Sequence, residues 1–449
     1  MNLSFADLRA SIYATMRAPI VQILGWLCLL VSTYPQLYDK DYRLPLHFDV
    51  YVYWYALNNW FSGNSLYDWY ALPDNKMYPF TYPPFGAWAL SPLTWFDYEI
   101  AAPLMIMAIA LQTAVIVALV GRSLGCSWGS AFAIAPWAAI LVQQCLEPFN
   151  QSVGFAQVNT AMMALVMIDV AAPPRWKGRG VASGLAAAIK LTPAIAVLIF
   201  LLRRQWRSAI TMVATSLTVT LLSWIISPSE SARFFFDAMW DPQRAGDAYY
   251  AGNQNLKGFV ARALPENAWS ITWAITVALA LVVAIWLCLR IQAAATSVVI
   301  PHSASDDAVA APSAVATAPA PVLPENLATL LTAAVIMTLG LLVSPITWSH
   351  HWVWGLATVV VLIVVALRLN SMALMGTALA QGALFIMAPH WWFPYGQVNE
   401  LHWSVVKQLV GSSYTLAAIA SGVALAWALP VQATARLGWN SLRRTDAPI

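Results

Sequence analysis

The stretch "GRGVASGLAAAIKLTPAIAVLIFLLRRQWR", residues 178–207, decides the fold. Its centre is apolar over a length that could cross a bilayer once, but both of its flanks are strongly basic. A single crossing would put one basic flank on each side of the membrane, although Lys and Arg concentrate on the cytoplasmic side. The pattern therefore favours a half-depth helical hairpin with Lys190, Thr192 and Pro193 at its tip. An ordinary crossing with a snorkelling lysine is the alternative.

The composition of the whole 449-residue chain agrees with a membrane protein. Hydrophobic residues make up 60% and charged residues 10%, whereas a soluble domain carries about 25% charged residues. Such a chain cannot cover its surface with polar groups, so most of that surface must face lipid. We therefore expect one all-α polytopic membrane domain over residues 1–449. The net charge of +3 gives no reason to expect a nucleic-acid partner.

Apolar segments of about 20 residues recur along the chain and predict ten membrane spans. The short, proline-rich segment 81–95 is expected to be partly embedded. We expect about 10–12 transmembrane helices together with the half-depth hairpin. The ten spans are predicted at 20–37, 100–120, 130–147, 156–172, 208–227, 269–290, 327–345, 351–368, 372–388 and 412–432. If these spans alternate, the basic residues between them fall on one side, the cytoplasm: Arg9, Arg17, Arg122, Arg175, Lys177, Arg179, Arg290, Arg368, Arg436, Arg443 and Arg444.

The remaining polar and aromatic residues then gather in loops on the extracytoplasmic side. Residues 296–325 are rich in Ala, Pro and Ser without periodicity and predict a disordered cytoplasmic linker. Because long amphipathic loops occur on the outer side only, we expect the chemistry there. The predicted outer loops are 38–98, 148–155, 228–268, 346–350 and 389–411.

The first outer loop contains "LPLHFDVYVYWYALNNWFSGNSLYDWY", residues 44–70, in which Asp49 stands among aromatic residues. Burial without an adjacent cation raises the pKa of a carboxyl group toward the range of a general base. The same residues also fit a helix N-cap, with Asp49 starting an interfacial helix. Spacing alone leaves both interpretations open.

Two further outer stretches carry polar groups. In "LLVSPITWSHHWVWGL", residues 341–356, His350 and His351 lie between two spans. Adjacent helical residues point about 100° apart, so this pair is not a metal site by itself, and an interfacial structural role remains open. The loop "DPQRAGDAYYAGNQNLKGFVAR", residues 241–262, offers amides suited to sugars and cations suited to phosphate, although interfacial helices also carry basic residues. These groups belong to Arg244, Asn253, Gln254, Asn255, Lys257 and Arg262.

Motif patterns narrow the class of function. GxGxxG, Walker, HExxH and GxSxG patterns are missing from suitable contexts, which disfavours a cytosolic nucleotide-using enzyme. A transporter and an integral enzyme acting on a lipid-borne substrate remain. Transporters usually carry broken helices at matching places in both halves, and this sequence shows one hairpin pattern without a second copy. The enzyme is therefore favoured.

Several blocks occur together in an order that resembles a known family. After Asp49 come "NSLYDWY", "YPFTYPPFGAWALSPL", "GFAQVNTAMMALV", "GLAAAIKLTPAIAVL", "GNQNLKGFVAR" and "SPITWSHHWVW". Together they resemble the actinobacterial membrane mannosyltransferases of the GT-C superfamily. The matched blocks run from about residue 49 to 355, whereas the tail after 370 matches only as generic spans and the Ala/Pro linker departs from the family.

The resemblance implies a GT-C fold and an inverting α-mannosyltransferase in the plasma membrane. Its donor would be polyprenyl-phosphate-mannose, and its acceptor a mannosylated phosphatidylinositol lipid, extended through an α-1,2 linkage at the extracytoplasmic face. Two alternatives stay open: α-1,2 branching of lipomannan or lipoarabinomannan, and a flippase of a lipid-linked sugar. We expect membrane lipids as neighbours and neither a cofactor nor a metal.

The resemblance also assigns roles to residues. It implies Asp49 as catalytic base, Lys190 as a donor-binding residue and one of the two adjacent histidines as a catalytic residue, with His350 preferred. The chemistry agrees, because a donor already activated by phosphate needs one base and cations at the leaving group. For the donor phosphate we expect Lys190, Arg244, Lys257, Arg262 and His351. For the sugars we expect Tyr51, Tyr53, Trp54, Tyr82, Asn253, Gln254, Asn255 and Trp348.

Overall fold

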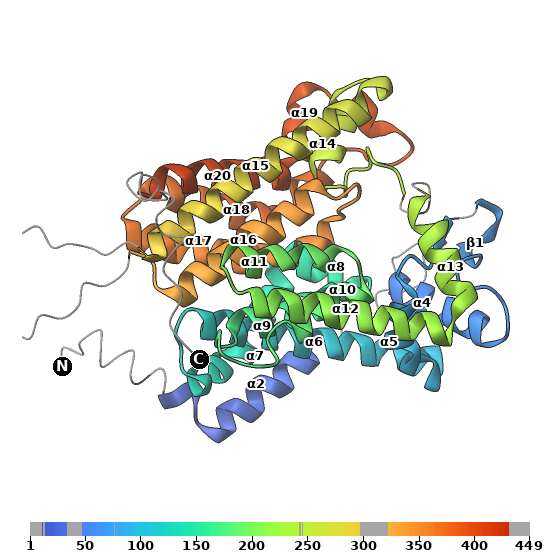
Figure 1. The fold of residues 1–449 in the computed structure, drawn as a ribbon, viewed down its shortest axis with the longest axis horizontal. Coiled ribbons are helices and arrows are strands. Elements are labelled where there is room, and N and C mark those ends of the chain that lie inside the picture. The colour runs from blue at the N-terminus through green and yellow to red at the C-terminus, as the bar shows by residue number, and fades with distance from the viewer. Residues whose placement is uncertain are drawn as a thin grey trace, which may run out of the picture.

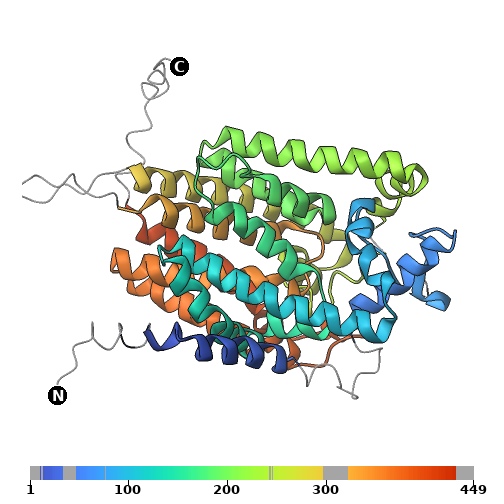
Figure 2. The same ribbon diagram turned by 90° about the horizontal axis from the view of Figure 1, so that it is seen from below.

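The computed structural model describes residues 11, 14–33, 47–75, 77–241, 244, 246–296 and 322–430. They form a bundle of long helices that run side by side, with shorter helices and a small β-hairpin at one end (Figures 1 and 2). Some predictions lie outside the described residues. They concern Arg9, Arg436, Arg443, Arg444, residues 38–46 of the first outer loop and residues 297–321 of the linker.

The helical bundle is built from twelve elements of the described chain. They are α2 (Pro19–Val31), α6 (Tyr98–Ser123), α7 (Trp128–Cys145), α9 (Asn159–Ala171), α10 (Val181–Ile189), α11 (Val197–Leu202), α12 (Trp206–Ile226), α15 (Trp269–Thr296), α16 (Glu325–Val343), α17 (Gly355–Leu369), α18 (Met372–Met387) and α20 (Ser413–Ala428).

Shorter elements connect these helices. They are α4 (Phe48–Phe61), β1 (Tyr70–Leu72), β2 (Met77–Pro79), α5 (Pro84–Leu90), α8 (Glu147–Gly154), α13 (Pro228–Phe236), α14 (Leu256–Ala263), α19 (Val405–Gly411) and the 3₁₀ turns η1 (Pro73–Asn75), η2 (Ser91–Trp95), η3 (Thr192–Ala196), η4 (Ala238–Trp240), η6 (Glu266–Ala268), η7 (Ser349–Trp354), η8 (Pro389–Trp391) and η9 (Asn399–His402). Strands β1 and β2 pair antiparallel, with Tyr70 opposite Pro79.

The polytopic membrane architecture is confirmed. Within the described ranges, six helices are long and apolar enough to span a membrane, and eight if the bent pairs α7–α8 and α19–α20 are each one span. Each of the ten predicted spans overlaps a helix, but six to eight spans are fewer than the ten that were predicted. However, α2 and α9 have only 13 residues each, about 20 Å of helix, which is less than the roughly 30 Å of the hydrocarbon core.

Helices α12 and α15 show where lipid would contact the bundle. Only 17% of an 18-residue apolar stretch of α12 is buried inside the protein, and 28% of such a stretch of the helix that contains α15. The exposed side chains include Leu217, Leu221 and Ile225 of α12 and Ile271 and Ile275 of α15. Water would solvate such a continuous apolar surface poorly, so these two faces are suited to lipid.

The structure confirms the predicted hairpin. Gly180, just before α10, packs so closely on the start of α12 that an added Cβ would lie 2.3 Å from the carbonyl oxygen of Ser208. Helix α11 ends shortly before α12 begins. The guanidinium of Arg179 lies 5.5 Å from the ring centroid of Phe200, so both ends of the hairpin meet at the same end of α12. A single crossing would have separated them.

The tip of the hairpin forms because of one proline. Pro193 has no N–H to donate to the carbonyl of Ile189, and its ring would clash with that carbonyl in a continuous helix. Helix α10 therefore ends at Ile189, and Lys190 takes an extended conformation with φ −144°. Gly86 of α5 covers this break, and a Cβ there would lie 2.5 Å from the carbonyl oxygen of Ile189. The tip thus lies directly against α5.

One loop prediction needs correction. Residues 148–154 belong to helix α8, which is bent by 87° from α7, and do not form a simple turn. Segment 81–95 forms α5 and η2, and seven residues of α-helix are about 10 Å long, so α5 does not cross a membrane. The described parts of the two large outer loops, α4, β1, α13 and α14, do lie toward one end of the bundle (Figure 1).

A separate apolar core fixes the first outer loop to the bundle. Tyr53 of α4, together with Phe80 and Tyr82, packs against Ile106 of α6 and Phe234 of α13. All five side chains are buried. Because the phenol groups of this core also face the polar residues described below, the same packing positions the candidate site.

Candidate active site

Asp49 lies in the first turn of α4 but does not cap it. The N-cap residue is His47, whose backbone adopts the left-handed conformation with φ 60°, and the cap makes no side-chain hydrogen bond. The backbone N–H of Asp49 donates instead to the carbonyl of Phe155. Its carboxylate accepts a hydrogen bond of 2.6 Å from the side-chain amide of Gln157. The structure therefore excludes the N-cap interpretation.

Gln157 connects Asp49 to two buried phenols. Its Oε1 lies 3.1 Å from the hydroxyls of Tyr53 and Tyr82 and accepts from the backbone N–H of Val158. The two hydroxyls are 2.8 Å apart. With donors around Oε1, the Nε2 of the amide must face the carboxylate. The predicted residues Tyr53 and Tyr82 therefore lie beside Asp49, through Gln157.

The surroundings of Asp49 give its carboxyl group the properties of a base. Burial raises the pKa of Asp49 to about 6, and the hydrogen bond from Gln157 and the positive charge of Lys190 act in the opposite direction. Asp49 lies outside the helices that could span the membrane. At neutral pH the group is ionised and more basic than an ordinary carboxylate.

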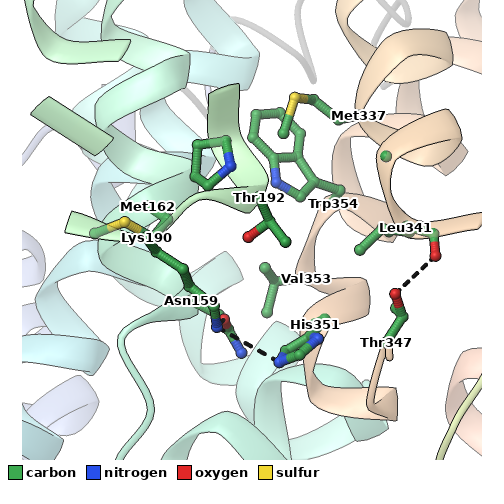
Figure 3. A pocket seen from close by; sticks show the side chains of 12 residues that line it. Asn159, Met162, Lys190, Thr192, Met337, Leu341, Thr347, His351, Val353 and Trp354 are labelled. Atoms are coloured by element: carbon green, nitrogen blue, oxygen red, sulfur yellow. Dashed lines mark hydrogen bonds between the residues drawn. The ribbon is translucent and has the colours of Figure 1, made fainter. Parts of the chain in front are cut away.

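Lys190 enters the same cluster from the hairpin tip (Figure 3). Its Nζ donates to Oδ1 of Asn159 over 2.8 Å, lies 3.5 Å from Nε2 of His351 and lies 5.1 Å from the ring centroid of Tyr82. Tyr82 thus touches both Lys190 and the amide that holds Asp49. The hairpin tip, the first outer loop and η7, the segment with His350 and His351 (the histidine segment), meet at one place.

A pocket opens beside Lys190. Its lining combines the polar side chains of Asn159, Lys190, Thr192, Thr347 and His351 with apolar side chains (Figure 3). An amphipathic ligand with a polar head and a hydrocarbon chain would match such a lining. The apolar lining residues include Met162, Met337, Leu341, Val353 and Trp354.

His351 presents a hydrogen-bond donor to this pocket. Its Nδ1 accepts from the backbone N–H of Trp348 over 3.2 Å, so a neutral ring carries its proton on Nε2. The Nε2 faces Lys190, whose ammonium group is also a donor. Two facing donors cannot satisfy each other, and an anionic oxygen bound beside them would accept from both. The arrangement suits phosphate.

His350 has different surroundings. Its ring packs 5.3 Å from that of Phe155, and its carbonyl accepts from Ser152 and Asn159. His351 lines the pocket and His350 does not. The position in the pocket favours His351, although His350 was preferred from the sequence, and which histidine acts stays a prediction.

The amides of the second outer loop belong to the scaffold, contrary to the prediction that they bind sugar. Asn253, Gln254 and Asn255 are fully buried. The Oδ1 of Asn253 accepts from the backbone N–H of Thr347, and the Nδ2 of Asn255 donates to the carbonyl of Ser344. The three residues fix the segment that precedes His350 and His351 by binding its backbone.

Replacing Gln254 by leucine should therefore lower stability. Its Nε2 donates to the carbonyls of Ala251 and Gly411, and its Oε1 lies 3.4 Å from the backbone N–H of Tyr414. A buried polar group left without a partner costs about 1–3 kcal/mol. We expect a thermal unfolding temperature several degrees below that of the unchanged protein in detergent.

The matched control is Gln144→Leu, at an exposed glutamine that makes one hydrogen bond to the carbonyl of Ser32. It should shift the unfolding temperature by less than about one degree, because water replaces an exposed partner. If Gln254→Leu has the same unfolding temperature as this control, Gln254 is not part of the scaffold.

Three other cations that were predicted to bind the phosphate do not line the pocket beside Lys190. Arg262 is buried and donates to the carbonyls of Tyr249, Tyr250 and Asn253. Arg244 donates to backbone carbonyls within the first outer loop. The Nζ of Lys257 lies 5.1 Å from the ring centroid of Trp273. These contacts stabilise the outer elements, and the prediction that they bind phosphate is not supported by their positions.

Two of the aromatic residues that were predicted to bind sugar also lie outside the cluster around Asp49. Residues two apart on a helix point about 200° apart, so Tyr51 faces away from Asp49, and its ring packs on Tyr55 and Tyr98. Trp54 donates to a backbone carbonyl at Phe96. Neither joins the cluster. Trp348 remains nearby, through its backbone bond to His351.

Sequence reasoning missed Gln157 and Asn159. Gln157 holds Asp49, and Asn159 accepts from Lys190 while donating to the carbonyl of His350. Both stand in "GFAQVNTAMMALV", residues 154–166. Two polar residues at the start of the predicted span 156–172 were a signal that could have found them.

A third missed residue, Glu147, supports the histidine segment from behind. Its carboxylate accepts from the hydroxyl of Ser349, the indole of Trp391 and the hydroxyl of Tyr414. The ring of His390 lies 3.6 Å away. This buried network fixes η7 against α8 and α20.

Protein ligands for a metal would be clustered His, Cys, Asp or Glu residues. Groups of three or more such residues do not occur within the described ranges of this chain. The expectation that the site needs no metal stays a prediction.

Comparisons with known proteins identify the family of the chain. Residues 80–304 match glycosyltransferase family 87. The chain is 29% identical over 432 residues to a polyprenol-phosphate-mannose-dependent alpha-(1-2)-phosphatidylinositol mannoside mannosyltransferase of Mycolicibacterium smegmatis, covering 91% of this chain and 89% of the relative. A protein of the same description from Mycobacterium tuberculosis is 29% identical over 394 residues, covering 84% and 83%.

A third relative is a polyprenol-phosphate-mannose-dependent alpha-(1-2)-phosphatidylinositol pentamannoside mannosyltransferase of Mycolicibacterium smegmatis. It is 28% identical over 345 residues, covering 75% of this chain and 73% of the relative. The search of solved structures found no match.

Proposed function

The chain belongs to glycosyltransferase family 87, and from this membership we propose that it transfers mannose from polyprenyl-phosphate-mannose to a phosphatidylinositol mannoside through an α-1,2 linkage. The relatives that share most of its length are described as enzymes of this kind. We further propose that transfer takes place at the extracytoplasmic face of the plasma membrane and needs no metal.

One observation carries the proposal. A half-buried carboxylate, Asp49, and a donor pair for phosphate, Lys190 and His351, lie at two ends of one cluster joined by Tyr82. An inverting transfer needs a base on one side of the anomeric carbon and positive charge on the side of the leaving phosphate. The pocket beside Lys190 has the polar and apolar lining that a polyprenyl phosphate would need.

The proposed reaction is a single displacement. The acceptor hydroxyl attacks the anomeric carbon of mannose as Asp49 takes its proton. The bond from that carbon to the phosphate oxygen breaks, and the electron pair leaves with polyprenyl phosphate. Lys190 and the Nε2–H of His351 donate to the phosphate as its charge increases. A second carboxylate is not needed, because the leaving group is already stable as an anion.

The location rests on the distribution of elements. Helices α4, α5 and α13 come from segments predicted to be extracytoplasmic and lie toward one end of the bundle (Figure 1). Asp49 belongs to α4, and the tip of the hairpin packs against Gly86 of α5. The acceptor lipid would approach from this end, with its own lipid chains in the membrane.

The test uses the full-length protein purified in detergent with EDTA present. It is incubated with radiolabelled polyprenyl-phosphate-mannose and a phosphatidylinositol mannoside, and the labelled lipid is digested with an α-1,2-specific mannosidase. We expect a mannosylated lipid that loses its label on digestion. A transporter would give no covalent product in detergent, and the absence of product would refute the proposal.

The pH dependence of transfer should follow Asp49. Because burial raises its pKa to about 6 and a base acts in its ionised form, kcat/KM should be constant above neutrality and fall about tenfold per pH unit below 6. Initial rates between pH 4.5 and 8 measure this. The protein should be assayed for folding at each pH, and an acid limb near pH 4 in folded protein would contradict the assignment.

A further inference from the structure

Gln157 contacts Asp49 directly but has no role in the reaction steps proposed above. Its side chain is 6% exposed, and it reaches Asp49 from the turn between α8 and α9, 108 residues away along the chain. A buried amide in a membrane protein is costly unless every polar atom is paired. All its polar contacts are with residues of the cluster.

The orientation of this amide is determined by its surroundings. Oε1 accepts from the backbone N–H of Val158, and the hydroxyls of Tyr53 and Tyr82 also lie within hydrogen-bond distance of it. The two hydroxyls share two protons among three contacts, so at least one donates to Oε1. A flipped amide would turn its N–H groups toward the N–H of Val158 and lose these bonds. Nε2 is therefore held toward Asp49.

This contact distinguishes the two oxygens of the carboxylate. Oδ2 of Asp49 accepts from Gln157 over 2.6 Å, whereas Oδ1 has no hydrogen-bond donor among the residues that the structure describes. The oxygen without a partner is the one that remains to take a proton from a substrate hydroxyl. The amide thus fixes the rotation of the carboxylate about its side chain.

The first outer loop makes the surroundings of Gln157 rigid. Tyr82 is followed by Pro83 and Pro84, whose rings restrict the backbone at the start of α5. The hydroxyl of Tyr67 donates to the carbonyl of Tyr82 over 2.8 Å. Tyr82 is therefore fixed both at its backbone and at its hydroxyl, and it also lies under the ammonium group of Lys190.

From these contacts we infer that Gln157 is a positioning residue for the catalytic base: it holds Oδ2 of Asp49 so that Oδ1 faces the acceptor hydroxyl, and Tyr82 ties this geometry to Lys190 on the leaving-group side. The inference rests on the proposed function. Gln157 itself contacts neither substrate nor the reacting atoms.

Replacing Gln157 by methionine removes the donor but keeps the volume of the side chain. We expect kcat for mannosyl transfer to fall about 10- to 100-fold, less than for loss of the base itself. The KM for polyprenyl-phosphate-mannose should change by less than about threefold, because Lys190 and His351 are untouched. The acid limb of the pH profile should move upward by about one unit, because a hydrogen bond that favours the ionised carboxylate is lost.

A second variant, Gln157→Glu, keeps the shape of the side chain and adds a carboxyl group beside Asp49. Two carboxylates at this distance cannot both ionise readily, so the acid limb should move upward further than in Gln157→Met. The control for the loss of a buried amide is Gln381→Met, at a fully buried glutamine that accepts from Ser421 between α18 and α20. It should lower thermal stability but leave the pH profile unchanged.

The outcomes separate the two claims. If the unchanged protein makes no mannosyl lipid, the proposed function fails. If that protein is active and folded Gln157→Met keeps its kcat and its acid limb, the positioning role fails while the function stands. A loss of activity that only follows the folded fraction, as in the Gln381→Met control, also overturns the inference.

Discussion

Replacing Asp49 by asparagine should lower the rate of mannosyl transfer by about 10²- to 10⁴-fold, the usual contribution of a general base. The amide group cannot take the proton of the acceptor hydroxyl. The fold should be unaffected, because the Oδ1 of asparagine can still accept from Nε2 of Gln157 as the carboxylate does. Initial rates with radiolabelled polyprenyl-phosphate-mannose, compared at equal amounts of folded protein, measure the effect.

The matched control is Asp68→Asn, at a second carboxylate of the first outer loop. Asp68 is exposed and accepts from Arg233 over 2.7 Å, and exposed ion pairs contribute little to stability. This variant should transfer mannose within about twofold of the unchanged protein. Asp49 would lose its role as base if Asp49→Asn kept more than a few per cent of the activity.

The sequence could predict the hairpin because local chemistry determines it. Basic flanks and Pro193 act within the segment itself, so the break after Ile189 followed from charge and from the missing N–H of proline. The meeting of Lys190 with His351, 161 residues apart, was implied only by resemblance. Its geometry depends on how α9 and η7 pack.

The role of Asp49 could not be decided from spacing for a related reason. A cap and a base differ in what the side chain contacts, and its contact is Gln157, on a turn far along the chain. The direction of the Tyr51 side chain, in contrast, could be predicted from the sequence, because the helical period places it opposite Asp49 and beside Tyr55. Applying the period of the helix to the sequence would have separated Tyr51 from Asp49.

The amides of residues 253–255 show the limit of composition. Asparagine and glutamine bind sugar hydroxyls and backbone carbonyls with the same groups. Only burial separates the two uses, and here all three side chains are fully buried. Those of Asn253 and Asn255 bind the segment before His350, and that of Gln254 binds the carbonyls of Ala251 and Gly411. Arg262 is ambiguous in the same way, because a guanidinium can donate to phosphate or to backbone carbonyls, and here it donates to carbonyls.

Replacing Lys190 by methionine should lower kcat about 10²- to 10³-fold, as removal of one preorganised group at a developing charge does. The side chain keeps its length, but it no longer donates to the leaving phosphate or to Asn159. The KM for the donor should rise as well, since the phosphate is present before the reaction and is held by the same group. Thermal stability should change little, because a half-buried charge is lost together with its desolvation cost.

Lys257→Met is the sharpest comparison, because sequence reasoning assigned both lysines to the donor phosphate and the structure separates them. Lys257 of α14 lies over the ring of Trp273 of α15. It is outside the pocket that Lys190 and His351 line. Lys257→Met should keep kcat and KM within about threefold of the unchanged protein. Lys190→Arg should recover part of the loss, since its charge remains while the fit beside Asn159 changes. Equal losses in Lys190→Met and Lys257→Met would place the phosphate elsewhere, and the site built around Asp49 would then lack its leaving-group side.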